Sequence, residues 1–286
     1  MKIAKSVPKL LILFLIFFAT NNEAGARGNR DFENALSTME SSFVEEEANS
    51  ADAYYLGRAV AANILASYKE YNGNPELTRY LNEICQTLVI NSAYPDLYNG
   101  YRVIILDSPE INALATSGGH IFITKGLVEA AASEDMLAAI IAHELAHIML
   151  KHSLSMIDDM RLYDEMSAMA DRAIEFAGNS ERAARLSYFR NSVAATLDAL
   201  VKDGYSQDQE FDADEGAIVL LAASGYNPQA LLEILRILEG VQASQRGGFN
   251  NTHPSPSQRI LSAARFVTQY KVEDTSSYRE SRFRNK

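Results

Sequence analysis

The sequence predicts an α+β fold that is mostly helical, with a small mixed or antiparallel sheet beside one buried helix. Apolar residues recur at spacings of three and four over most of the chain, as expected for one face of a helix. Between residues 101 and 124, short β-branched and aromatic runs are bounded by turn residues, which is typical of strands. The chain has 286 residues, of which 47% are apolar and 22% charged, and this is enough for a sizeable globular core.

Residues 1–26 have the pattern of a secretory signal peptide. Three lysines precede an apolar run from Leu10 to Ala19, and the small residues Ala24-Gly25-Ala26 offer a cleavage site before Arg27. The apolar run has about half of the roughly 20 residues that a membrane-spanning helix needs. We therefore expect an exported protein whose mature chain has no transmembrane span.

Residues 27–100 are predicted to form an N-terminal helical part of the domain. Helical spacing extends over residues 51–71 and 76–91, with the turn Asn72-Gly73-Asn74-Pro75 between them. The only cysteine, Cys85, lies in the second segment and is expected in the core. A single cysteine also excludes an intrachain disulfide.

Residues 101–270 are predicted to form the core that carries the chemistry, and residues 271–286 a flexible, solvated tail. Two strands are expected, at 101–107 and at His120–Thr124. Helices are expected at 133–152, 156–177, 181–202, 206–223, 228–238 and 258–270.

The formal net charge of −11 argues against two classes of partner. Nucleic-acid binding requires a basic surface, so no nucleic-acid partner is expected. An acidic surface also disfavours tight docking on anionic lipid.

The strongest local signal is His143-Glu144-Leu145-Ala146-His147, inside a segment predicted as a helix. Histidines four residues apart project from one helical face, so both imidazoles can bind one divalent ion. Glu144 follows the first histidine and is placed to act as base for a water molecule beside the metal. The alternative is an incidental pair on a surface helix. The apolar residues around the motif instead predict a buried helix, where unpaired polar groups are costly.

Two histidines leave a catalytic zinc one protein ligand short. The metzincin pattern is excluded, because it requires glycine and histidine where this chain has Leu150 and Ser153. Neither His120 nor His152 is needed as a ligand. We expect His152 to point away from the metal, because it lies five residues after His147.

A later helix offers the third ligand in Glu210-Phe211-Asp212-Ala213-Asp214. Glu210 and Asp214 share one helical face, so Glu210 can bind zinc while Asp214 accepts the second N–H of a ligand histidine. The spacing alone leaves other carboxylates open as candidates, namely Asp208, Asp212 and Glu215.

The chain resembles the gluzincin endopeptidase family that includes HtpX, BepA and the CAAX prenyl proteases. The resemblance extends from about residue 101 to residue 267. It is carried by His143-Glu144-x-x-His147, Glu210-Phe211-Asp212-Ala213-Asp214, Thr252-His253-Pro254-Ser255 with Arg259, and Asn112-Ala113 ahead of Gly118-Gly119-His120-Ile121-Phe122. HtpX and the prenyl proteases have several membrane spans, so the chain is most similar to the soluble, periplasmic BepA-like branch. The helical-repeat domain of BepA is not expected here.

This resemblance implies a zincin-like metallopeptidase domain with one Zn²⁺ per chain, held by His143, His147 and Glu210. Asp214 and Arg259 are then expected outside the ligand set, where Asp214 orients a ligand histidine and Arg259 orients the loop that contains His253 through a carboxylate.

The resemblance also implies a catalytic role for His253 beside the base Glu144. His253 would either stabilise the oxyanion or occupy the open zinc position in a latent state, and the sequence leaves both open. Read without the resemblance, it is an exposed histidine in a proline-rich loop.

Related peptidases hold an extended substrate as an added antiparallel strand, through main-chain hydrogen bonds. On this basis substrate contacts are predicted along one strand and its approach, at Asn112, Gly119, His120, Ile121 and Phe122. The alternative is an ordinary sheet strand.

We therefore expect a zinc-dependent endopeptidase of the bacterial cell envelope that acts on unfolded or misassembled envelope proteins. The expected location is the periplasm, with peripheral association with the outer membrane or its assembly machinery as a further hypothesis. Two alternatives remain: a latent, mainly chaperone-like zinc protein gated by His253, and a non-enzymatic assembly factor. The intact Glu144 argues against the second, because zinc binding alone does not require it.

Overall fold

The computed structural model describes residues 53–97, 99–154, 193–194, 204–242, 255–270, 272–273 and 275–284. These residues belong to one compact unit, Ser50–Lys286. The predicted signal peptide, the expected helix at 156–177, most of that at 181–202 and the predicted catalytic residue His253 lie outside the described residues.

The sheet has three strands, β1 (Arg102–Leu106), β2 (Ala113–Ala115) and β3 (His120–Thr124), in the order β1-β3-β2. β1 runs parallel to β3, with Val103 opposite Ile121, and β2 runs antiparallel to β3, with Leu114 opposite Phe122. The prediction of a small mixed sheet in a mostly helical fold is confirmed.

Alternate residues of each strand point to opposite sides of the sheet, and both sides are buried. In β1, Ile104 and Leu106 pack with Val60 and Ile64 of the helix at residues 53–67. Their neighbours Val103 and Ile105 pack into the main core on the other face. Burial on both sides explains why the strand is a continuous apolar run rather than an alternating one.

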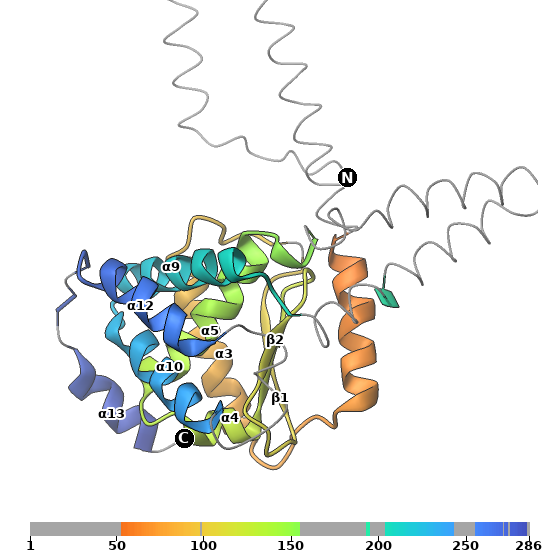
Figure 1. Cartoon of the computed structure of the whole chain (residues 1–286). Coiled ribbons are helices and arrows are strands. Elements are labelled where there is room, and N and C mark those ends of the chain that lie inside the picture. Colours follow the sequence, from red (N-terminus) through yellow and green to blue (C-terminus); the bar gives the residue numbers. More distant parts are fainter. Residues whose placement is uncertain are drawn as a thin grey trace, which may run out of the picture. The chain divides into compact units, whose positions relative to one another are not determined.

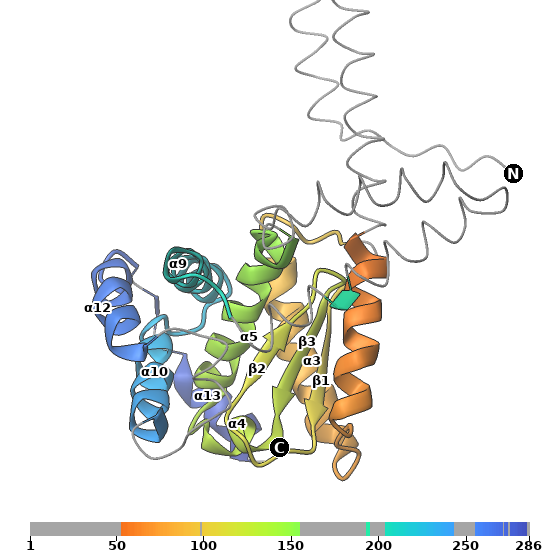
Figure 2. The same ribbon diagram turned by 45° about the vertical axis from the view of Figure 1, so that its right-hand side comes forward.

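Helices α3 (Pro75–Ile90) and α5 (Glu134–Met149) cover the main-core face of the sheet, opposite the helix at 53–67 (Figures 1 and 2). α4 (Lys125–Ala130) follows β3 directly. α9 (Gln207–Ala223), α10 (Gln229–Gln242) and α12 (Pro256–Val267) lie on the side of α5 away from the sheet (Figure 2). Within the described residues, no helix is both long and apolar enough to cross a bilayer.

Helix α13 (Ser276–Arg284) contradicts the expectation of a solvated tail at 271–286. Arg279 is buried, and its Nε donates to Asp135 Oδ2 at 2.9 Å. Arg282 donates to Glu134 Oε1 at 2.6 Å. Both acids begin α5, so two ion pairs hold the C-terminal helix against the start of the helix that carries the His-Glu-x-x-His motif.

We expect Arg279→Ala to lower the free energy of unfolding by about 3 kcal/mol, because breaking a buried pair leaves the Asp135 carboxylate uncompensated. Chemical denaturation measures this loss. The matched control is Arg284→Ala, whose pair with Glu280 is exposed and should contribute less than about 1 kcal/mol. Equal, small losses for both variants would show that α13 does not stabilise the domain.

Candidate metal centre

The two histidines of the motif are held on a helix that is buried along almost its whole length. Ser133 caps α5 by accepting from the amide of Met136, and the helix continues to Met149. His143 and His147 lie one turn apart, and their Nε2 atoms are 3.0 Å from each other. Four-residue spacing therefore places both ring nitrogens at one point, as the sequence predicts.

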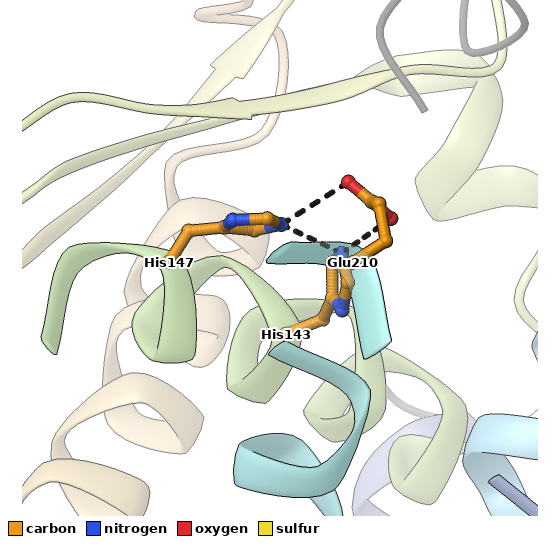
Figure 3. Close-up of side chains that lie close together, drawn as sticks. All are labelled: His143, His147 and Glu210. Atoms are coloured by element: carbon orange, nitrogen blue, oxygen red, sulfur yellow. Dashed lines mark hydrogen bonds and ion pairs between the residues drawn. The ribbon is translucent and has the colours of Figure 1, made fainter. Parts of the chain in front are cut away.

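Glu210 reaches the same point from α9, which starts with a capping box at Ser206. Its Oε1 lies 3.4 Å from His147 Nε2, and its Oε2 lies 3.5 Å from His143 Nε2. Figure 3 shows the three side chains converging from the two helices. Gly216 allows this approach, because a Cβ there would lie 2.9 Å from the Cβ of Ala146 on α5.

The spacing of these ligand atoms fits a zinc ion. Zinc binds imidazole nitrogen and carboxylate oxygen at about 2.0–2.2 Å in tetrahedral geometry, which requires ligand atoms about 3.3–3.6 Å apart. The separations of 3.0, 3.4 and 3.5 Å are close to this edge length. Among the described residues, these three side chains form the one group with suitable metal-ligand atoms.

The charge of the cluster also fits a divalent cation. Glu144, Glu210, Asp214 and Arg259 are each at most 1% exposed. With neutral histidines, three carboxylates and one guanidinium sum to −2, and uncompensated buried charge is costly. A divalent cation bound by His143, His147 and Glu210 brings the sum to zero.

Asp214 lies behind His143, at its Nδ1 side, and Arg259 contacts both Asp214 and the proposed ligand Glu210. His143 Nδ1 is 3.1 Å from Asp214 Oδ1. Arg259 donates to Asp214 through Nε and Nη2 at 2.9 and 2.6 Å, and its Nη1 lies 2.8 Å from Glu210 Oε2. Arg259 on α12 thus links the carboxylates of Asp214 and Glu210 on α9. Its predicted action on the loop that contains His253 involves residues outside those described.

The protonation of His143 and Asp214 follows from these contacts. Burial and the charge of Arg259 oppose protonation of His143, but contacts with Asp214 and Glu210 outweigh them and raise its pKa to about 9. Burial alone would raise the pKa of Asp214, whereas Arg259 and His143 lower it. In the metal-free cluster, a proton on His143 therefore supplies part of the positive charge that a metal would supply.

The expectation that His152 points away from the metal missed its contact with a ligand, His147. It assumed that the helix continues to residue 152, but α5 ends at Met149. Lys151 then adopts a left-handed conformation, with φ of 58°. The chain leaves the axis of α5 at this turn, and His152 Nδ1 lies 2.9 Å from His147 Nδ1.

Tyr205 is a further residue of the site that the sequence did not single out. Its ring stacks on His147, with centroids 3.8 Å apart and planes 14° apart. Burial, followed by the nearby charges of Glu144 and Glu210, raises the pKa of its hydroxyl. It directly precedes the N-cap of α9, and a lone tyrosine at that place carries no recognisable signal.

A mostly apolar pocket adjoins the cluster. His143, Glu144 and Arg259 form its polar part. The apolar lining comes from α10, α5, α4 and β2: Leu231, Ile234, Leu235, Leu238, Ala139, Ile140, Leu127 and Ala113. A pocket that contains the predicted base has the place and polarity to accept an apolar group of a substrate.

The five predicted substrate-contacting residues do not line this pocket. β3 is the central strand and pairs on both edges, so a substrate strand cannot add beside His120–Thr124. Phe122 and Ile121 are fully buried, and His120 stacks on Tyr54. The backbone N–H of Asn112, the residue before β2, instead donates to Thr124 Oγ1 on β3 at 3.0 Å.

The remaining predicted residue, Gly119, serves the turn before β3. Its φ of 79° favours glycine, and a Cβ would lie 2.3 Å from the carbonyl oxygen of Gly100. Its role in the structure is to let two loops approach.

Comparison with known proteins agrees with this geometry. A family described as Peptidase family M48 matches residues 75–266. The "Beta-barrel assembly-enhancing protease" of Escherichia coli (strain K12) is 25% identical over 198 residues, which cover 68% of this chain and 40% of that protein. The "Mitochondrial metalloendopeptidase OMA1" of Schizosaccharomyces pombe is 27% identical over 209 residues, which cover 71% of this chain and 58% of that protein. The chain thus spans about half the length of these relatives.

Proposed function

Because the chain belongs to peptidase family M48, we propose that it is a zinc-dependent endopeptidase in which His143, His147 and Glu210 hold one zinc ion. The observation that carries the proposal is the convergence of these three side chains, with the fully buried Glu144 directly beside His143. Their separations and the charge of −2 around them support a divalent metal.

Bound zinc would polarise the scissile carbonyl and lower the pKa of a water molecule. Glu144 is the proposed general base: its carboxylate takes the proton of the attacking water and passes it to the leaving amine. Its place in the pocket wall, beside His143, gives the carboxylate access to a peptide bound there. Arg259 and Asp214 hold His143 and Glu210 in position during this transfer.

We place the extended substrate along β2 rather than β3. Within the described part of the chain, β2 pairs with β3 on one edge only. Ala113, at one end of β2, also lines the pocket with Glu144. A peptide added along this edge would bind through main-chain hydrogen bonds, with little dependence on its sequence.

Unfolded or misassembled envelope proteins are the proposed substrates, and the periplasm is the proposed location. The main support is the export pattern of residues 1–26. The name of the Escherichia coli relative refers to β-barrel assembly, whereas that of the yeast relative refers to mitochondria. An extended chain suits an added-strand mode of binding, which favours unfolded proteins over folded ones.

Metal content, measured by mass spectrometry on the purified protein, and cleavage of casein together test the proposal. We expect about one zinc per chain, loss of cleavage on chelation and recovery when zinc is returned. His147→Ala should lose both zinc and cleavage. Absence of zinc from the wild type would refute the proposal. Zinc without cleavage would favour the latent state gated by His253, in which case His253→Ala should gain activity.

A further inference from the structure

The two proposed zinc histidines are held by different chemistry on their outer sides. His143 Nδ1 faces the carboxylate of Asp214 at 3.1 Å, which is itself held by Arg259. His147 Nδ1 faces another imidazole, that of His152, at 2.9 Å. One ligand is therefore backed by an ion pair and the other by a histidine.

Only one proton can lie between the two Nδ1 atoms of His147 and His152. If His152 donates it, the N–H of a neutral His147 is at Nε2, which points at His143 Nε2 3.0 Å away and cannot bind a metal. If His147 donates it, its Nε2 presents a lone pair at the point where the ligands converge. Metal binding thus requires His152 to be the acceptor, with its own proton on Nε2.

The ring plane of His147 is fixed at the same time. Tyr205 stacks on its face, and the ring of His152 meets it at an interplanar angle of 70°, with centroids 5.0 Å apart. His152 and Tyr205 are themselves only 6% exposed. Contacts on one edge and one face leave the imidazole little freedom to rotate.

We propose that His152 is a positioning residue that fixes the tautomer and ring plane of His147 for metal binding. The inference rests on the proposed zinc site, and it adds a role for His152 beyond the ligand set. Hydrogen-bond partners of ligand histidines typically change metal affinity about 10- to 100-fold when they are removed.

Charge explains why an imidazole suits this place. The buried cluster already carries −2, which one divalent cation neutralises. A carboxylate at residue 152 would leave an excess negative charge in the core, whereas a neutral imidazole accepts the same hydrogen bond without one.

Zinc affinity, measured by competition with a chromogenic chelator, tests the proposal on the full chain. His152→Ala removes the acceptor and should weaken zinc binding about 10- to 100-fold. His152→Asn keeps an oxygen acceptor near the place of Nδ1, so it should restore affinity to within about threefold of wild type, a free-energy difference of under 1 kcal/mol. His152→Gln places its acceptor nearer the place of Nε2, so it should not restore zinc affinity. The matched control is His120→Ala, which removes the half-buried imidazole on β3.

A Co²⁺-substituted protein gives a second readout that a packing defect would not reproduce. The visible absorption of Co²⁺ should change in His152→Ala and return in His152→Asn. Wild-type affinity in His152→Ala would overturn the inference, and so would equal weakening in the Ala and Asn variants. If His152→Ala does not fold, His152→Gln takes its place in this comparison. Failure of the wild type to bind zinc would instead refute the proposed function itself.

Discussion

Replacing Glu144 with glutamine should lower kcat for peptide hydrolysis about 10²- to 10⁴-fold while zinc stays bound. Glutamine has nearly the same shape as glutamate but cannot accept the proton of the attacking water at neutral pH. Glu144 is outside the group of three converging ligands, so the substitution leaves the metal ligands in place. Initial rates of casein cleavage and zinc content, measured on the same preparation, check both parts of this prediction.

Glu129→Gln is the matched control, because Glu129 is an exposed glutamate paired with Lys125 on α4. It should keep wild-type kcat and wild-type zinc content. An unchanged kcat in Glu144→Gln would mean that another group acts as base. Loss of zinc in the same variant would mean that Glu144 holds the metal, which contradicts its assignment as base.

Elements with a strong local pattern could be predicted from the sequence. β3 has the predicted bounds, because a β-branched and aromatic run ends at a residue that caps the next helix. α5 starts at the predicted cap, Ser133, and α9 at the predicted Ser206. Helix ends were less predictable. α5 stops three residues before the expected end, and no glycine or proline signals this, because the left-handed residue that follows is Lys151.

β2 and α13 could not be predicted because tertiary contacts make them. Ala113–Ala115 has no β-branched residue, and it becomes a strand by pairing with β3. α13 is strongly polar, so its sequence resembles a solvated tail. The buried pair of Arg279 with Asp135, at the distant start of α5, is what keeps it in place.

In the candidate site too, relations that are local in sequence could be predicted and tertiary contacts could not. Spacing places His143 and His147 on one helical face, since that relation is local. Spacing left several carboxylates near Glu210 open as the third ligand. The close approach of α9 to α5 brings Glu210 to the histidines. The contacts of His152 and Tyr205 with His147 were missed, because both depend on how the chain turns outside the regular helices.

Arg259→Met should lower the free energy of unfolding of the metal-free protein by about 3–5 kcal/mol. Methionine fills much of the same space but leaves Asp214 and Glu210 buried without their guanidinium partner. The depressed pKa of Asp214 depends largely on Arg259, so the carboxyl would lose the interactions that keep it ionised in the core. Urea denaturation of the metal-free protein measures the loss.

Arg265→Met is the matched control, because Arg265 lies on the same helix, α12, but is exposed. Its effect should stay within about 0.5 kcal/mol. A similarly small effect for Arg259→Met would show that the ion pairs at the site do not stabilise the fold. The expected loss should shrink when zinc is added, since a divalent cation compensates the same two carboxylates through Glu210 and His143. If zinc leaves the loss of unfolding free energy unchanged, Arg259 stabilises the fold independently of the metal centre.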